Sequence, residues 1–183
     1  RAPIFRFDEI EEAMAFLKTI DTHYDEIKAA AESTTRHGKL LRIDKHIIHN
    51  RVILDFIYHT AEAAGQNMVT LSTDAACRFI VEKLSGETPL RYLLESNFNA
   101  DKNPAHRSLI KGRGHHVISS IQIPNRVLKK LLRVSADELL EACTDKQLGS
   151  QMAGVLGYNL HTANALAALY LALGQDVACV AEN

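Results

Sequence analysis

The hydrophobic and polar positions of the first sixty residues follow a helical period and then a strand period. Residues 8–18 are amphipathic and open on a capping-box pattern, and residues 21–32 predict a second helix. Residues 40–48 and 52–58 predict two strands, the second alternating between two faces, with a polar turn between them. This part of the chain therefore predicts two helices followed by a β-hairpin.

Helical and strand patterns continue to alternate through the middle of the chain. Residues 68–84 predict a helix, 90–94 and 116–123 predict strands, and 125–132 predict a short helix. Ser135 opens a second capping-box pattern, which predicts one more helix. The order of elements predicts an α+β fold, in which a ferredoxin-like antiparallel sheet carries its helices on one face.

No Asp, Glu, Lys or Arg lies between Lys146 and Asp176. Polar residues interrupt this stretch, whereas a membrane span needs about 20 mainly apolar residues in a row. We therefore expect a long buried central helix. His161 and Asn164 share one face of it, either as a polar pair satisfied inside a core or as functional groups.

Composition limits the class of protein. The chain has 183 residues, 46% of them hydrophobic and 23% charged, which is typical of a soluble globular protein with one domain or a domain and part of another. A net charge of -1 argues against a nucleic-acid partner. Three cysteines without a CxxC motif indicate reduced thiols and a cytoplasmic location. The chain begins at Arg1 without Met and shows no membrane segment, so we expect a piece of a longer protein.

Histidines and glycines offer only weak motifs. His46 and His49 are spaced HxxH, and His115 is next to His116, but no Cys or acidic residue is spaced to complete a zinc site, so we predict no metal. Gly65 stands in a strand-to-helix turn, where backbone N–H groups can face a phosphate.

Several motifs in the same order resemble one enzyme family across nearly the whole chain. They are Ser33-Thr-Thr-Arg, Gly65-Gln-Asn-Met, Asp101-Lys-Asn-Pro, Gly112-Arg-Gly, GSQMAG, GYNLHTAN and GQD. The chain is very similar to the core of hydroxymethylglutaryl-coenzyme A (HMG-CoA) reductase. The resemblance implies that residues 1–7 end a large-domain segment, 8–124 form the small NADP-binding domain, and 125–183 belong to the large, substrate-binding domain. It also implies a homodimer or higher homo-oligomer.

The resemblance gives catalytic roles to residues that would otherwise be ordinary. A lysine in a loop, such as Lys102, is usually a solvated charge. In the family, the corresponding lysine stabilises the oxyanion when a thioester accepts hydride, and Asp176 resembles the aspartate that hydrogen-bonds it. Asn164 resembles the asparagine that completes this network. We therefore predict that Lys102 and Asp176 lie close together.

Substrate-binding residues are also implied by the resemblance. They are Asp101, Asn103, Arg133, Lys146 and His161. Lys146 resembles a lysine that contacts the hydroxymethylglutaryl group, and Arg133 and His161 resemble residues on the coenzyme A side. Asn103 stands where the family has a second lysine. Glu95 stands where it has a serine, and a carboxylate there would repel an anionic substrate.

Cofactor-binding residues come from two motifs. They are Thr35, Arg36, Glu62, Gln66, Asn67 and Met68. Thr35 and Arg36 resemble the pair that grips the 2′-phosphate, which favours NADPH over NADH because an arginine beside a hydroxyl suits a phosphate dianion. The nicotinamide-side motif departs from the family pattern, with Glu62 in place of Asp and Gln66 in place of Met.

The resemblance implies reduction of HMG-CoA to mevalonate with two NADPH. The family's catalytic glutamate and C-terminal histidine have no counterpart in the chain, so we expect these 183 residues alone to be inactive. The departures at Glu62, Glu95 and Asn103 leave an alternative, a divergent nucleotide- or partner-binding module that keeps the fold without the chemistry. A preference for NADPH over NADH would distinguish the reductase from the module.

Overall fold

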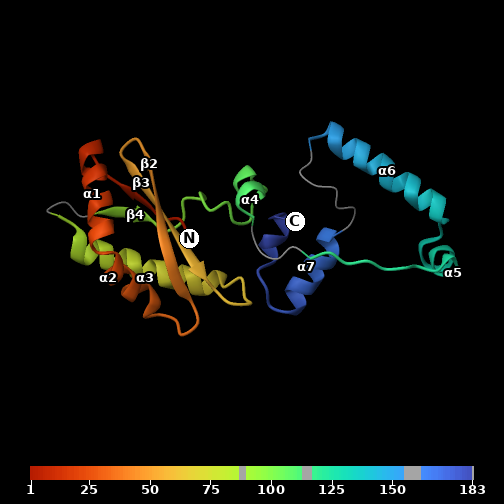
Figure 1. Ribbon diagram of the computed structural model, residues 1–183, viewed down its shortest axis with the longest axis horizontal. Helices are drawn as coiled ribbons and strands as arrows, with labels where there is room; N and C mark the ends of the chain where they lie inside the picture. Colours follow the sequence, from red (N-terminus) through yellow and green to blue (C-terminus); the bar gives the residue numbers. More distant parts are fainter. Residues whose placement is uncertain (87–89, 113–116, 155–161, 183) are drawn as a thin grey trace. The chain divides into compact units, whose positions relative to one another are not determined.

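The chain forms two compact units in the computed structural model. These units are Arg1–Asp101 and Lys102–Asn183. The structure describes residues 1–86, 90–112, 117–154 and 162–182 (Figure 1). The domain boundaries expected at residues 7 and 124 stay a prediction.

A four-stranded antiparallel sheet forms the first unit, in the order β2-β3-β1-β4. The strands are β1 (Ile4–Arg6), β2 (Lys39–Ile48), β3 (Arg51–His59) and β4 (Arg91–Leu93). Helices follow β1 and β3, so the chain runs β-α-α-β-β-α-β with the crossovers of a ferredoxin-like fold. The predicted α+β fold class is confirmed.

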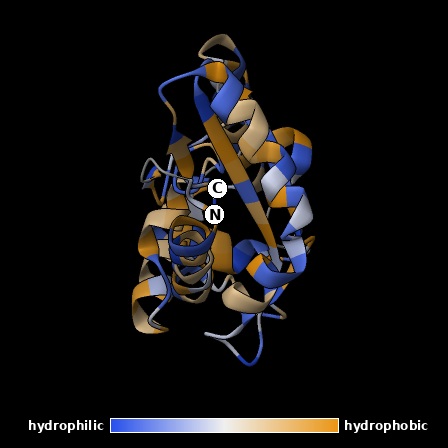
Figure 2. Cartoon of the chain, turned by 90° about the vertical axis from the view of Figure 1, so that its left-hand side faces the viewer, coloured by the Kyte–Doolittle hydropathy of each residue, from blue (hydrophilic) through white to orange (hydrophobic). Residues whose placement is uncertain are grey.

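Three helices pack on one face of this sheet. They are α1 (Ile10–Thr22), α2 (Tyr24–Glu32) and α3 (Gln66–Leu84). Phe5 and Val52 are opposite each other on neighbouring strands and meet Phe16, Ile27 and Ile80 of the helices in one buried cluster. Each such side chain stabilises the fold by about 1.5–3 kcal/mol relative to its exposed state. Figure 2 shows that the helices and the long strand carry both hydrophobic and hydrophilic residues, as one-sided burial requires.

The strand predicted at residues 116–123 is wrong. Residues 117–123 have no regular secondary structure, and Ile118 and Ile121 are 86% and 83% exposed. The fourth strand is β1, which pairs with β3 on one side and β4 on the other. A strand-like pattern forms a strand only where it pairs with another backbone, and in this sheet β1 holds the place between β3 and β4.

The second unit is helical in its described part. It contains α4 (His106–Lys111), α5 (Asn125–Val127), a π-helical turn (Leu128–Leu132), α6 (Ala136–Met152), α7 (Thr162–Ala172) and a 3₁₀ helix η2 (Val177–Glu182). Ser135 accepts a hydrogen bond from Glu138 N, and the Glu138 side chain accepts one from Ser135 N. The predicted capping box therefore starts α6 at the expected residue.

The expected long buried helix differs in both length and burial. Helix α6 ends at Met152, and Gly154 follows with φ +68°, a left-handed conformation that a continuous helix does not allow. Helix α7 begins only at Thr162, and none of its residues is buried within this chain. An apolar helix is buried only where other segments cover it, and the described part of this unit supplies few. Among the described residues, no helix is both long enough and apolar enough to cross a bilayer.

Candidate functional site

Lys102 and Asp176 form an ion pair, with Lys102 Nζ 2.6 Å from Asp176 Oδ2. The two residues are far apart in sequence and belong to the same compact unit. Their side chains are 40% and 30% exposed, so the pair is open to a ligand but partly shielded from water. The contact predicted from the sequence is therefore present.

Both partners are held by the turn into η2. Asp176 follows the end of α7, where its Oδ1 accepts a hydrogen bond from Ala178 N at 3.2 Å. Its other carboxylate oxygen remains for the lysine. Lys102 has φ +64°, a conformation that costs a non-glycine residue about 1 kcal/mol or more. Its backbone N–H donates to Glu182, and this contact helps to hold the strained residue in place.

This arrangement suits chemistry that builds negative charge on oxygen. The carboxylate keeps the lysine charged and fixes its direction, while the ammonium retains donors for a second acceptor. A positioned ammonium can stabilise an oxyanion by several kcal/mol in a site that excludes water.

Three other predicted substrate and catalytic residues lie on or next to helices of the same unit. Asn164 is exposed on α7, Lys146 is exposed on α6, and Arg133 is exposed with φ +61° before α6. Asn103 is exposed beside Lys102. His161 lies outside the described residues.

The two predicted cofactor motifs meet in the first unit. Thr35 Oγ1 lies 3.0 Å from Met68 Sδ, so the loop before β2 contacts the first turn of α3. The same hydroxyl accepts hydrogen bonds from His37 N and Gly38 N, both at 3.1 Å. The Thr35 hydroxyl therefore holds the loop in shape. Of the two residues predicted to contact a phosphate, Arg36 remains the main candidate.

Arg36 is exposed and makes no hydrogen bond or ion pair within the described residues. Glu32 closes its loop by accepting from Leu40 N at 2.9 Å and from Lys39 Nζ at 3.3 Å. Burial acts to raise the pKa of Glu32, but these hydrogen bonds and the Lys39 charge outweigh it and hold the pKa below its ordinary value. A carboxylate that stays ionised thus anchors the loop carrying Arg36.

Gly65 is the N-cap of α3 and has φ +68°. A Cβ at this position would lie 2.9 Å from Thr60 Cγ2, so both backbone conformation and space require glycine. Glu62 and Asn67, on either side of it, are exposed. No acidic residue lies in the first turn of α3, and its N–H groups are available to a negatively charged group.

Arg1 is a residue of this region that sequence analysis missed. Its guanidinium contacts Glu95 Oε2 at 2.6 Å, Thr70 Oγ1 at 2.7 Å and Gln66 Oε1 at 3.3 Å, and its side chain is only 13% exposed. Glu95 also accepts from Asn99 Nδ2 at 2.8 Å. The departure at Glu95 was visible in the sequence, but its partner was not.

Comparison with known proteins identifies the family. The sequence matches the family model described as hydroxymethylglutaryl-coenzyme A reductase over residues 1–183. The chain belongs to the hydroxymethylglutaryl-coenzyme A reductase family. It is 38% identical to the 3-hydroxy-3-methylglutaryl-coenzyme A reductase of Haloferax volcanii over 184 residues, covering 100% of the chain and 45% of the relative.

Other HMG-CoA reductases match in the same way. The enzyme of Methanothermobacter thermautotrophicus is 38% identical over 100% of the chain and 46% of its own length. That of Ganoderma lucidum is 38% identical over 97% of the chain and 15% of its own length. The chain thus spans less than half the length of the HMG-CoA reductases it matches.

Proposed function

We propose that the protein containing this chain reduces 3-hydroxy-3-methylglutaryl-CoA to mevalonate with two NADPH. The observation that supports it most directly is the 2.6 Å contact between Lys102 and Asp176, because the family resemblance gives these two residues the catalytic roles. In this proposal residues 8–124 form the small NADP-binding domain, and residues 125–183 belong to the large domain of a cytoplasmic homodimer or higher homo-oligomer.

Lys102 serves both reductive steps. One NADPH would supply a hydride to the thioester carbonyl, the resulting hemithioacetal would release coenzyme A as the thiol, and a second NADPH would supply a hydride to the aldehyde that remains. Each addition leaves negative charge on oxygen, which the Lys102 ammonium stabilises or neutralises with a proton. Asp176 holds the ammonium in position, and Asn164 completes the network.

Arg36 gives the site its preference for NADPH. Its guanidinium can pair bidentately with a 2′-phosphate dianion. Thr35 and Met68 hold the loop against α3, whose N-terminus favours the negative groups of a dinucleotide. Glu62, Gln66 and Asn67 surround this turn on the nicotinamide side.

The ion pair of Arg1 with Glu95 bears on whether the site can accept an anionic substrate. A free Glu95 carboxylate would repel an anionic substrate, but this one is paired with Arg1 at 2.6 Å and bonded to Asn99. Its charge is therefore largely compensated within the unit. Asp101, Asn103, Lys146, Arg133 and His161 remain the proposed contacts to HMG-CoA.

Lys102→Gln in the full-length protein tests the proposal. We expect kcat for HMG-CoA-dependent NADPH oxidation to fall by about 10²–10³-fold, as for loss of one oxyanion-stabilising group. Lys130→Gln, an exposed lysine of the same unit, should leave kcat unchanged. The 183 residues alone should not turn over. Full activity in Lys102→Gln, or turnover by the 183 residues, would contradict the proposal.

A further inference from the structure

Three arginines form one row across the end of the sheet in the first unit. Arg6 of β1 is directly opposite Arg51 of β3 and Arg91 of β4. Residues opposite each other in an antiparallel pair share a face, with Cβ atoms about 5 Å apart. Like charges in such positions destabilise a sheet, and this row contains three.

Within the described part of the chain, no carboxylate forms an ion pair with the arginines of this row. Arg6 and Arg91 are exposed, and their side chains make no hydrogen bond or ion pair within the described residues. Arg51 Nη1 donates instead to Asn50 Oδ1 at 2.7 Å and to the Asn50 and Phe7 carbonyls at 3.2 and 3.4 Å. The positive charge of the row is thus not neutralised by the described part of the chain.

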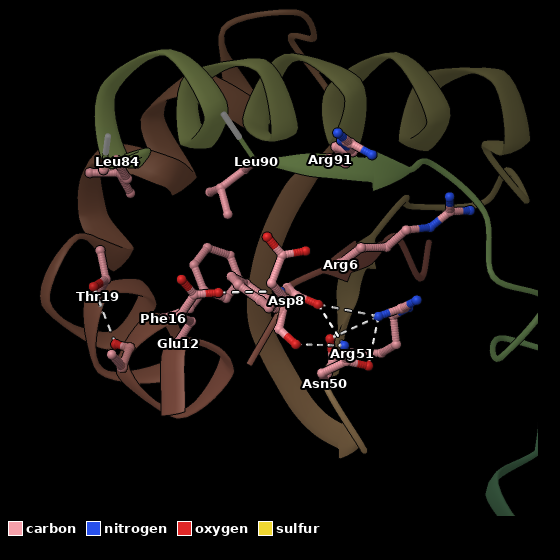
Figure 3. A pocket seen from close by; sticks show the side chains of 13 residues that line it. Arg6, Asp8, Glu12, Phe16, Thr19, Asn50, Arg51, Leu84, Leu90 and Arg91 are labelled. Atoms are coloured by element: carbon pink, nitrogen blue, oxygen red, sulfur yellow. Dashed lines mark hydrogen bonds between the residues drawn. The ribbon is translucent and has the colours of Figure 1, made fainter. Parts of the chain in front are cut away.

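These arginines line one side of a pocket of about 850 Å³ (Figure 3). Phe16, Leu84 and Leu90 line the same pocket from the helix-covered face of the sheet, whereas the arginines alternate with the residues of that face. Two carboxylates also line it. Glu12 accepts hydrogen bonds from the backbone N–H groups of Asp8 and Glu9 at 3.2 and 3.3 Å, so these N–H groups at the start of α1 partly compensate its negative charge. Asp8 adds one more negative charge, which leaves the lining net positive.

We propose that the arginine row binds the phosphate or diphosphate group of a small molecule. Guanidinium groups are suited to bidentate contact with phosphate oxygens, and the pocket has the volume of a small-molecule site. An anion in the row also relieves the repulsion that the free protein carries.

This site is separate from the proposed cofactor site. Arg51 pairs with Ile48 at the turn end of the β2-β3 hairpin. Lys39, which follows the loop carrying Arg36, pairs with His59 at the opposite end of the hairpin. Along β2, Lys39 and Ile48 are nine residues apart, so the two residue pairs are separated by roughly 30 Å. One nucleotide cannot fill both sites with the same phosphate group.

Calorimetric titration of inorganic pyrophosphate into the full-length protein tests the proposal. We expect saturable binding that Arg91→Ala weakens by about tenfold or more, since each charge-assisted hydrogen bond is worth at least that factor. Arg36→Ala should retain pyrophosphate binding at the row. No binding by the wild type, or binding lost in Arg36→Ala and kept in Arg91→Ala, would overturn the proposal whatever the reductase assay shows.

Melting temperatures show whether a variant loses pyrophosphate binding because it fails to fold. In anion-free buffer, Arg91→Ala and Arg6→Gln should melt at or above the wild-type temperature, because each removes a repulsive charge. Pyrophosphate at ten times its Kd should raise the wild-type melting temperature by about 1–3 °C, and the variants' by less. Equal rises in all three proteins would refute the site.

Discussion

Single charged residues in this chain depend on local turns for their positions. Asp176 divides its two oxygens between a helix start and Lys102, and Thr35 uses its hydroxyl to shape the loop that presents Arg36. In both cases a short polar contact near the end of a helix or before a strand fixes the side chain. A functional prediction for such a residue can therefore be tested without disturbing the hydrophobic core.

Arg36→Ala should remove the preference for NADPH in the full-length protein. We expect KM for NADPH to rise by about 10–100-fold while KM for NADH changes little, because the contact proposed for Arg36 is a charge-assisted hydrogen bond to the 2′-phosphate. Steady-state kinetics with both nucleotides measure it. Arg42→Ala, an exposed arginine on β2 paired with Asp44, is the matched control and should change neither value.

We expect the burial of Cys77 to lower the free energy of unfolding of the first unit at alkaline pH. Burial raises the pKa of its thiol above the ordinary value of 9.0. The folded state therefore keeps this proton above pH 9 while the unfolded state loses it, so the free energy of unfolding falls as pH rises, by at most about 1.4 kcal/mol per pH unit for one group. Denaturant unfolding between pH 7 and 11 should show a shallower fall in Cys77→Ala. An unchanged slope would contradict this account.

Helix ends decide where the larger elements begin and stop. Gly65 starts α3 in a left-handed conformation, and Gly154 follows the end of α6 in another. The capping box of Ser135 and Glu138 starts α6. The two ends of α6 thus follow local chemistry, whereas the burial of its faces depends on segments farther away.

Gly65→Ala should destabilise the first unit by about 2 kcal/mol. An alanine in the left-handed region costs about 1–2 kcal/mol, and its Cβ would also press on Thr60. Chemical denaturation measures the loss. Gly86→Ala, where no heavy atom lies within 4 Å of an added Cβ, should stay within about 0.5 kcal/mol of the wild type. Equal effects of both substitutions would show that conformation at Gly65 is not the cause.

Hydrophobic burial is unevenly divided between the two units. The buried core cluster draws all its members from the first unit, including Phe5, Ile27 and Ile80. In the described part of the second unit, Leu128 is the buried hydrophobic residue, while Leu169 and Leu171 are 53% and 69% exposed. The first unit therefore has its own source of stability, and the second depends on additional contacts.

Residues 1–101 expressed alone should fold cooperatively, because the sheet and its three helices enclose a complete core. Residues 102–183 alone should lack a cooperative transition. Thermal melting followed by circular dichroism, with proton NMR dispersion as a second probe, measures both. A sharp transition in residues 102–183 together with dispersed resonances would contradict this division.

The sequence by itself determined most elements, the fold class, the family and the pairing of Lys102 with Asp176. Hydrophobic periodicity and capping residues act locally, and separated family motifs retain their order, so both are readable along the chain. Only the tertiary structure decided that β1 rather than residues 116–123 completes the sheet, that Arg1 holds Glu95, and that three arginines share one row. Strand pairing and the ion pair of Arg1 with Glu95 depend on which segments meet in space, and no local pattern or family motif named above encodes that choice.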